Sequence, residues 1–270
     1  MNFRADLHIH STCSDGTMTP EDILLEAKKV SLQGISITDH DSYSCYTEEF
    51  FHLAKKLNIL ILPGVEISSV EKEEKVHILA YGFDLKSITF SKFLEEICLR
   101  RKERNIEILE KLSQRNIKIS IEQLYGNSSS SVAIGRPHIA KILVDKGYVS
   151  SFKKAFDLYL KDHGSCYVTG RYFSPKEVLE QIHMAKGKAV LAHPHVICKS
   201  NVIKNLLDLP FDGIEAYYAK MLPVREKKWI DIAKKKGYLI TGGSDFHGKI
   251  KPHIPLGCSW ATKEVFDQLL

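Results

Sequence analysis

The sequence predicts an α/β protein in which parallel strands alternate with helices, in the manner of a β/α barrel. Two observations support this class. Short apolar runs alternate with amphipathic segments, and most of the apolar runs end in residues that can bind a metal. In barrels of this type the functional residues gather at the carboxyl ends of the strands. The length of 270 residues suits one large domain or two small ones.

The composition is that of an ordinary globular protein, with 44% hydrophobic and 26% charged residues. The net charge of +5 suits an anionic substrate but also falls within the range of many enzymes. The six cysteines are scattered, and no secretory leader precedes Asp6, so we expect reduced thiols and a cytoplasmic location. No apolar run reaches the roughly 20 residues that cross a bilayer. We therefore expect no membrane association, and nothing implies an obligate protein partner.

The first predicted strand carries two histidines. Side chains two residues apart on a strand face the same side, so His8 and His10 point to one place. Ser14, Asp15 and Gly16 then form a turn that can bring the Asp15 carboxylate over the same place. This arrangement predicts part of a metal site. A strand end with two solvated histidines fits the pair equally well, so the prediction depends on further donors downstream.

The next elements repeat this pattern. Thr19 and Pro20 are typical of a helix start, and Gly34 ends the helix. A strand over 35–38 leads to His40, a second helix covers about 46–57, and a strand over 59–62 leads to Glu66. The order β-α-β-α-β favours parallel strands joined by crossover helices.

Later strands also lead to potential ligands. We expect a strand over 76–81 that contains His77, and a charged turn over 71–75 joins it to the segment of Glu66. Further strands are expected over 188–192 before His193, over 213–217, and over 238–241 before Asp245 and His247. A single histidine after a strand is usually an ordinary polar residue. Five such coincidences in one chain favour a shared site.

The alternation stops between about residues 90 and 170. A long helical pattern covers 91–114, a low-complexity stretch follows at 128–131, a second helix begins near Arg136, and a third covers about 152–160. We expect residues 91–170 to form a helical insertion that caps the barrel mouth. Residues 1–90 and 171–270 would then form the barrel itself.

At this point the motifs resemble those of the PHP (polymerase and histidinol phosphatase) family. The matching motifs are Asp6-x-His8-x-His10-Ser11, Ser14-Asp15-Gly16, Thr38-Asp39-His40-Asp41, Gly64-Val65-Glu66, His77, His193-Pro194 and Ser244-Asp245-Phe246-His247-Gly248. The resemblance implies a distorted seven-stranded (β/α) barrel that holds up to three divalent metals.

Within the family, the insertion with its Gly135-Arg136-Pro137-His138-Ile139-Ala140 segment is similar to the small stand-alone bacterial members. Their known activities are dephosphorylation of nucleoside 3',5'-bisphosphates and 5'-to-3' exonuclease action on short RNA. The histidinol phosphatase branch is less similar. The partners that the resemblance implies are a phosphorylated small molecule or a short RNA.

The candidate ligands combine six imidazoles with three carboxylates. They are His8, His10, Asp15, His40, Glu66, His77, His193, Asp245 and His247. The set is too rich in nitrogen for Mg²⁺ or Ca²⁺ and favours Mn²⁺, with Fe²⁺ and Zn²⁺ as alternatives. Nine donors exceed the needs of one ion, so two or three ions are expected, and the resemblance implies that Glu66 bridges them. Such a centre activates a water molecule to hydrolyse a phosphoester.

Other residues have two possible roles. Arg136 is a candidate phosphate clamp, and His138 is a candidate phosphate donor or general acid, although a surface arginine and a capping histidine fit as well. Asp6 and Asp39 either accept the second ring N–H of a ligand histidine or are solvated loop carboxylates. Tyr217 and Tyr218 either stack on a base or belong to the core.

The leading hypothesis is therefore a metal-dependent phosphoesterase that acts on a nucleotide or on the 5' end of a short RNA. One alternative is a histidinol-phosphate-type phosphatase or an amidohydrolase on the same barrel. Another is a metal-binding module without activity. The complete set of donors argues against this last alternative, because a decayed site should have lost some of them.

Overall fold

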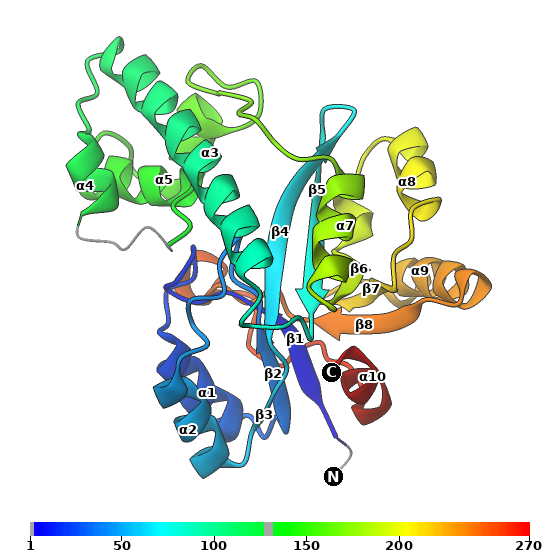
Figure 1. Ribbon diagram of the computed structural model, residues 1–270. Helices are drawn as coiled ribbons and strands as arrows, with labels where there is room; N and C mark the ends of the chain where they lie inside the picture. Colours follow the sequence, from blue (N-terminus) through cyan, green and yellow to red (C-terminus); the bar gives the residue numbers. More distant parts are fainter. Residues whose placement is uncertain (1–2, 127–131) are drawn as a thin grey trace. The chain divides into compact units, whose positions relative to one another are not determined.

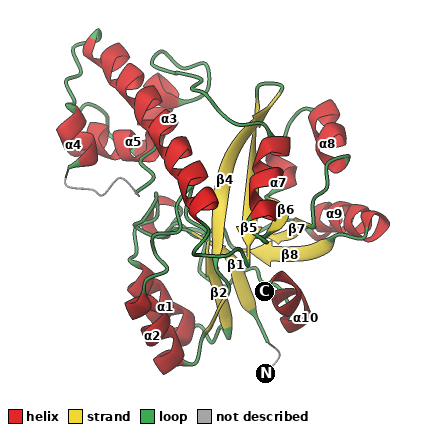
Figure 2. Cartoon of the chain, viewed as in Figure 1, coloured by secondary structure: helices red, strands yellow, loops and turns green. Residues whose placement is uncertain are grey.

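The computed structural model describes residues 3–126 and 132–270, so the low-complexity stretch predicted at 128–131 lies outside the described residues. The chain forms two compact units. The first contains Met1–Phe93 and Phe173–Leu270, and the second contains Leu94–Tyr172. Helices and strands alternate along most of the first unit, as Figure 2 shows, so the predicted α/β class is confirmed.

The first unit begins with a parallel sheet of three strands, β1 (Ala5–Ile9), β2 (Gly34–Ile37) and β3 (Leu60–Ile61). Helices α1 (Pro20–Lys29) and α2 (Glu48–Leu57) connect these strands and lie side by side next to the sheet (Figure 1). Both helices begin with a threonine N-cap, Thr19 and Thr47, whose side chain accepts a backbone N–H bond. The helix–strand alternation predicted for this region is therefore present.

A second sheet has the order β4-β5-β6-β7-β8. Its strands are β4 (Gly64–Glu71), β5 (Glu74–Tyr81), β6 (Lys188–Leu191), β7 (Gly213–Tyr218) and β8 (Leu239–Gly243). Strand β5 runs antiparallel to both β4 and β6, whereas β6, β7 and β8 are parallel. The parallel arrangement predicted from the β-α-β-α-β pattern therefore holds for β1, β2 and β3, whereas β5 departs from it.

The reason is the short turn between β4 and β5. Only Lys72 and Glu73 connect the two strands, and both adopt positive φ, 48° and 70°. A parallel connection needs a crossover of a dozen or more residues, whereas two residues suffice for an antiparallel hairpin. The segment that contains Glu66 was predicted as a loop after a strand, and it is instead the long strand β4.

Isolated bridges link the ends of the two sheets. Ile9 at the end of β1 pairs with Phe246 beyond β8, and His40 beyond β2 pairs with Glu66 of β4. Gly64 lets β4 approach β2 closely, because a Cβ at this position would collide with Ser36 Oγ. The carboxyl ends of β1, β2 and β8 are thereby brought to the side of β4 that carries Glu66.

The remaining helices of the first unit follow or precede strands of the second sheet. They are α7 (Pro175–Met184), η2 (Pro194–Val196), α8 (Ser200–Leu207), α9 (Pro223–Lys236), η3 (Gly248–Ile250) and α10 (Lys263–Leu269). Helix α7 lies over the face of β5 and β6 (Figure 1). Its capping box joins Ser174 and Glu177.

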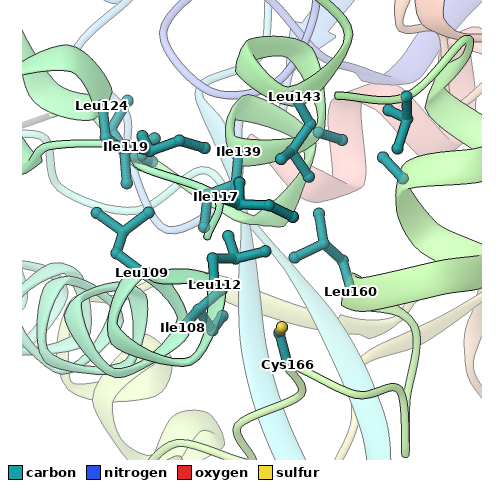
Figure 3. Packing of buried hydrophobic residues seen from close by; sticks show 14 residues of the cluster. Ile108, Leu109, Leu112, Ile117, Ile119, Leu124, Ile139, Leu143, Leu160 and Cys166 are labelled. Atoms are coloured by element: carbon teal, nitrogen blue, oxygen red, sulfur yellow. The ribbon is translucent and has the colours of Figure 1, made fainter. Parts of the chain in front are cut away.

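The second unit is built of helices and loops, with no strand among its described residues. Helix α3 (Ile88–Ser113) enters from the first unit, and α4 (Ile121–Tyr125), α5 (Arg136–Asp145), α6 (Phe152–Ala155) and the π-helical turn η1 (Phe156–Leu160) follow. Ile108 and Leu112 of α3 pack against Ile139 and Leu143 of α5 and against Leu160 (Figure 3). The unit thus has its own apolar core.

No helix among the described residues has both the length and the apolar character that a membrane span requires.

Leu112 and Leu99 of α3 provide a matched stability test in this unit, because Leu112 is fully buried and Leu99 is 56% exposed. We expect Leu112→Ala to lower the free energy of unfolding by about 2–5 kcal/mol, since it leaves a cavity in the core. Leu99→Ala should change it by less than about 0.5 kcal/mol. Urea denaturation followed by circular dichroism measures both values, and equal effects would contradict this description of the core.

Candidate metal centre

Three overlapping groups of metal-binding side chains lie together among the described residues of the first unit. They are His10, Asp15, His40 and His247; His8, His10 and Glu66; and His40, Glu66 and His77. Within each group, the ligand atoms all lie within 4.8 Å of one another. Because His10, His40 and Glu66 are shared, the three groups form one continuous cluster.

Glu66 occupies the middle of this cluster. Its Oε1 lies 2.9 Å from His77 Nδ1 and 2.9 Å from His193 Nε2. Its Oε2 lies 2.9 Å from His40 Nδ1, 3.2 Å from His10 Nε2 and 3.5 Å from His8 Nε2. One buried carboxylate therefore contacts five imidazoles.

The hairpin places His77 beside Glu66. In the β4–β5 register Glu66 pairs with Leu79, so His77 is the diagonal neighbour on the same face of the sheet. Side chains of alternate residues share a face, which directs both groups into the cluster. The antiparallel hairpin thus determines this pair.

Asp245 and Asp15 complete the cluster. Asp245 Oδ1 lies 3.3 Å from His10 Nε2, 3.3 Å from His247 Nδ1 and 3.7 Å from His8 Nε2. Asp15 Oδ1 lies 3.3 Å from His247 Nε2. The structure therefore brings together all nine residues predicted as ligands, whereas their role as ligands stays a prediction.

Two of these residues depend on unusual backbone conformations. His193 has φ 25° and Asp245 has φ 53°, values that non-glycine residues rarely adopt. Such conformations persist where the surrounding structure enforces them, often at functional sites. Here they turn the chain sharply at the ends of β6 and β8, where both side chains enter the cluster.

The electrostatics favour ionised carboxylates. Burial raises the pKa of Glu66, but the adjacent His77, His40 and His8 outweigh it and hold that pKa well below its usual value. Burial likewise opposes ionisation of Asp245, and His8 in particular brings its pKa well below the ordinary value. Both carboxylates are therefore available as anionic ligands.

The pKa of His10 is shifted in the opposite direction, above its ordinary value. Burial lowers the pKa of His10, but Asp245 and Glu66 outweigh it and raise that pKa to about 9. His8 Nε2 and His10 Nε2 are also buried without a well-formed hydrogen bond among the described residues. A divalent cation would bind the buried imidazole nitrogens in place of protons, and its charge would offset that of the carboxylates. The donor set thus fits divalent metals.

The sequence analysis missed Glu215, which orients His8. The His8 Nδ1–H donates to Glu215 Oε1 over 2.9 Å, and the His193 backbone N–H donates to Glu215 Oε2 over 2.7 Å. With its proton on Nδ1, His8 presents the Nε2 lone pair to the cluster, as in carboxylate–histidine–metal arrangements. A signal existed in the sequence, since Glu215 interrupts an otherwise apolar strand.

Asp6 and Asp39, which were expected to accept the second ring N–H of a ligand histidine, have other hydrogen-bond partners. Asp6 accepts the backbone N–H groups of Ser244, Gly257 and His8, and burial raises its pKa to about 6. Asp39 accepts hydrogen bonds from Ser11 and Ser14. Among the described residues neither carboxylate accepts a hydrogen bond from an imidazole, so the expected role is wrong, because both carboxylates are occupied in fixing loops around the cluster.

Arg136 and His138 belong to the second unit. Arg136 Nη1 donates to Leu160 O and Asp162 Oδ1, each over 2.8 Å. His138 Nδ1 accepts the Gly135 backbone N–H over 3.1 Å at the start of α5. The predicted roles of the two residues in substrate binding and catalysis stay predictions.

The chain is similar in sequence to several known proteins. The family model of the PHP domain matches residues 6–168. The chain is 30% identical to the 5'-3' exoribonuclease Rnm of Escherichia coli (strain K12), with 93% of this chain and 87% of that protein covered. It is 29% identical to a 3',5'-nucleoside bisphosphate phosphatase of Chromobacterium violaceum, with 90% and 86% covered.

A solved structure from Bifidobacterium adolescentis, described as a metal-dependent phosphoesterase, superposes with a TM-score of 0.89. It is 28% identical in sequence, and the match covers 98% of this chain and 95% of that one. The similarity in fold thus extends over nearly the whole chain.

Glu215 provides a test of the cluster as a metal centre. We expect Glu215→Gln to weaken Mn²⁺ binding by about 10–100-fold, because His8 loses the anionic acceptor that fixes its tautomer. Isothermal titration of metal-free protein with Mn²⁺ measures the change. The exposed Glu180→Gln is the matched control, and unchanged affinity in Glu215→Gln would argue against the role assigned to this carboxylate.

Proposed function

Because the chain belongs to the PHP domain family, we propose that it is a hydrolase that cleaves phosphate esters at a divalent-metal centre. The proposed substrates are nucleoside 3',5'-bisphosphates or similar phosphorylated nucleotides, the 5' end of a short RNA, or both. One observation carries the proposal: three groups of metal-binding side chains overlap in one cluster, two of them share the carboxylate of Glu66, and His10 and His40 join the third to them. The names of the relatives support the same reaction class.

We propose His8, His10, Asp15, His40, Glu66, His77, His193, Asp245 and His247 as the ligands of two or three ions. Three overlapping donor groups support this number. The mixture of imidazoles and carboxylates supports a transition metal, for which we propose Mn²⁺, with Fe²⁺ or Zn²⁺ as alternatives. The two oxygens of Glu66 face different histidines, which supports the proposal that this carboxylate bridges ions.

Divalent ions in such a centre lower the pKa of a coordinated water and offset charge on phosphoryl oxygens. The chain's own residues fix the orientation of a proposed ligand. Asp245 Oδ2 accepts hydrogen bonds from Tyr218 Oη and Lys251 Nζ, each over 2.6 Å, so that Oδ1 faces His8, His10 and His247. The two donors therefore fix which oxygen of Asp245 faces the histidines.

A cavity of about 240 Å³ opens onto the cluster. His40, His77 and His193 form part of its wall, and Lys251 contributes a positive charge. An ammonium group beside the cluster favours an anionic substrate such as a phosphate. The cavity and its charge support a phosphorylated substrate over a neutral one.

We further propose that the two sheets form the wall of a distorted β/α barrel. The bridges Ile9–Phe246 and His40–Glu66 support this arrangement, because each joins one sheet to the other next to the cluster. The residues that follow β1, β2, β6 and β8 all contribute to the cluster, as expected for the carboxyl ends of barrel strands.

Arg136 and His138 are proposed to bind the substrate phosphate. Arg136 lies at the first turn of α5, where backbone N–H groups favour anions. Its partner Asp162 is half exposed, so a phosphate can compete for the guanidinium. Because His138 Nδ1 accepts a backbone N–H, its proton resides on Nε2, from which it can be donated to a substrate oxygen.

A generic aryl phosphate tests the reaction class. We expect the protein with Mn²⁺ to release phosphate from 4-nitrophenyl phosphate and a chelator to abolish this activity. Asp245→Ala should reduce kcat/KM by more than about 100-fold, since it removes a proposed ligand rather than a supporting residue. The exposed Asp267→Ala is the matched control. Equal rates for the wild type and Asp245→Ala would favour a metal-binding module without activity.

A parallel assay tests the substrate class. Adenosine 3',5'-bisphosphate and a 5'-phosphorylated RNA oligomer are incubated separately with the Mn²⁺-loaded protein, and the products are separated by chromatography. We expect inorganic phosphate from the first substrate and mononucleotides from the second. If the protein hydrolyses neither substrate but remains active on the aryl phosphate, the proposed nucleotide specificity is contradicted.

A further inference from the structure

A second cavity, of about 470 Å³, lies in the first unit next to the metal centre. We call it the aromatic cavity. Its wall consists of Tyr217, Tyr218, Lys220, Met221, Glu226, Cys258, Ser259, Trp260 and Thr262. Tyr218 also lines the cavity over the metal cluster, so a single side chain separates the two.

Tyr218 is held firmly in this dividing position. Its Oη donates to Asp245 Oδ2 over 2.6 Å, and its ring centroid lies 4.5 Å from that of His195. A ligand that reaches from one cavity to the other must therefore pass this tyrosine. The aromatic cavity begins within one side chain of Asp245, a proposed metal ligand.

The other aromatic residues of the wall face solvent. Tyr217 is 37% exposed and Trp260 is 42% exposed, although both are large apolar side chains. Gly242 brings them together, because a Cβ there would lie 2.7 Å from Trp260 O and 2.7 Å from Tyr217 Cβ. The guanidinium carbon of Arg4 lies 5.3 Å from the centroid of the Trp260 ring, so this ring is held while part of it stays open.

These features match a nucleobase. Flat aromatic rings bind bases by stacking, with little dependence on sequence, and a cationic residue beside them favours the phosphate backbone. Lys220 provides such a charge in the same wall. The volume also falls within the range of about 300–1,000 Å³ that is usual for small-molecule sites.

We propose that the aromatic cavity stacks the nucleobase adjoining the phosphate that is hydrolysed at the metal centre. This proposal rests on the proposed function and adds to it the place where the base of the substrate binds, between Tyr217 and Trp260. The shared wall at Tyr218 carries the inference, since it places a base-sized aromatic site directly beside the reacting phosphate. Ribonucleotides and deoxyribonucleotides both supply this chemistry.

The test compares each substrate with an abasic counterpart. A 5'-phosphorylated dinucleotide and the same molecule with an abasic residue are assayed with Mn²⁺ in wild-type protein and in Trp260→Ala. We expect the wild type to prefer the base-containing molecule by about five- to a hundredfold in KM, the range of one stacking interaction. In Trp260→Ala this preference should fall below about twofold, and Trp260→Phe should restore part of it.

Ribose and deoxyribose versions of both molecules show whether RNA or DNA is bound. Loss of the base preference in Trp260→Ala in either series supports the proposal and identifies the nucleic acid, and an unchanged preference in both series overturns it. Tyr217→Ala is a second variant with the same expectation. It keeps the test valid should Trp260→Ala fold poorly.

A binding measurement separates this proposal from the proposed function. The chain has two tryptophans, and Trp229 is buried at 2% exposure, so Trp229→Phe leaves Trp260 as the sole reporter. We expect its emission to be quenched when adenosine 3',5'-bisphosphate is added, with metal chelated or present. Quenching without hydrolysis would reject the proposed function alone, whereas hydrolysis without quenching would reject the aromatic cavity as a base site.

Discussion

The contact of one buried carboxylate with five imidazoles is the interaction on which the rest of this structure depends. Glu66 is 1% exposed, and ionised groups in such a place are costly unless they are paired. Protons on the histidines provide one form of compensation, and divalent cations provide another that also satisfies the histidine nitrogens. Strands from both sheets meet at this residue, so the cluster and the fold have a common centre.

A second layer of polar residues surrounds the cluster and holds its side chains in position. Glu215 orients His8 through Nδ1 and binds the backbone of His193, while Tyr218 and Lys251 hold one oxygen of Asp245. These residues come from different strands and loops. Tyr218 has a double role, since it fixes Asp245 and separates the metal centre from the aromatic cavity.

Much of the local structure could be predicted from short-range patterns. Thr19 before Pro20 marked the start of α1, and the long apolar stripe after residue 90 marked α3, which the structure places at Ile88–Ser113. Strand β4 was missed, although the turn after it and strand β5 were expected, because Gly64–Glu71 follows β3 so closely that its apolar residues were taken as a strand end and loop. Assignment of residues 91–170 as a cap over the metal centre stays a prediction.

The sequence by itself determined the candidate chemistry of this protein, since its nine donor residues lie in or just after apolar runs whose periodicity is visible without coordinates. Only the tertiary structure decided how those donors are held. The bond between His8 and Glu215 joins residues 207 positions apart, and no local pattern encodes such a pairing. The positive φ of His193 and Asp245 has the same origin, because packing across the sheets enforces conformations that neither residue adopts by local preference.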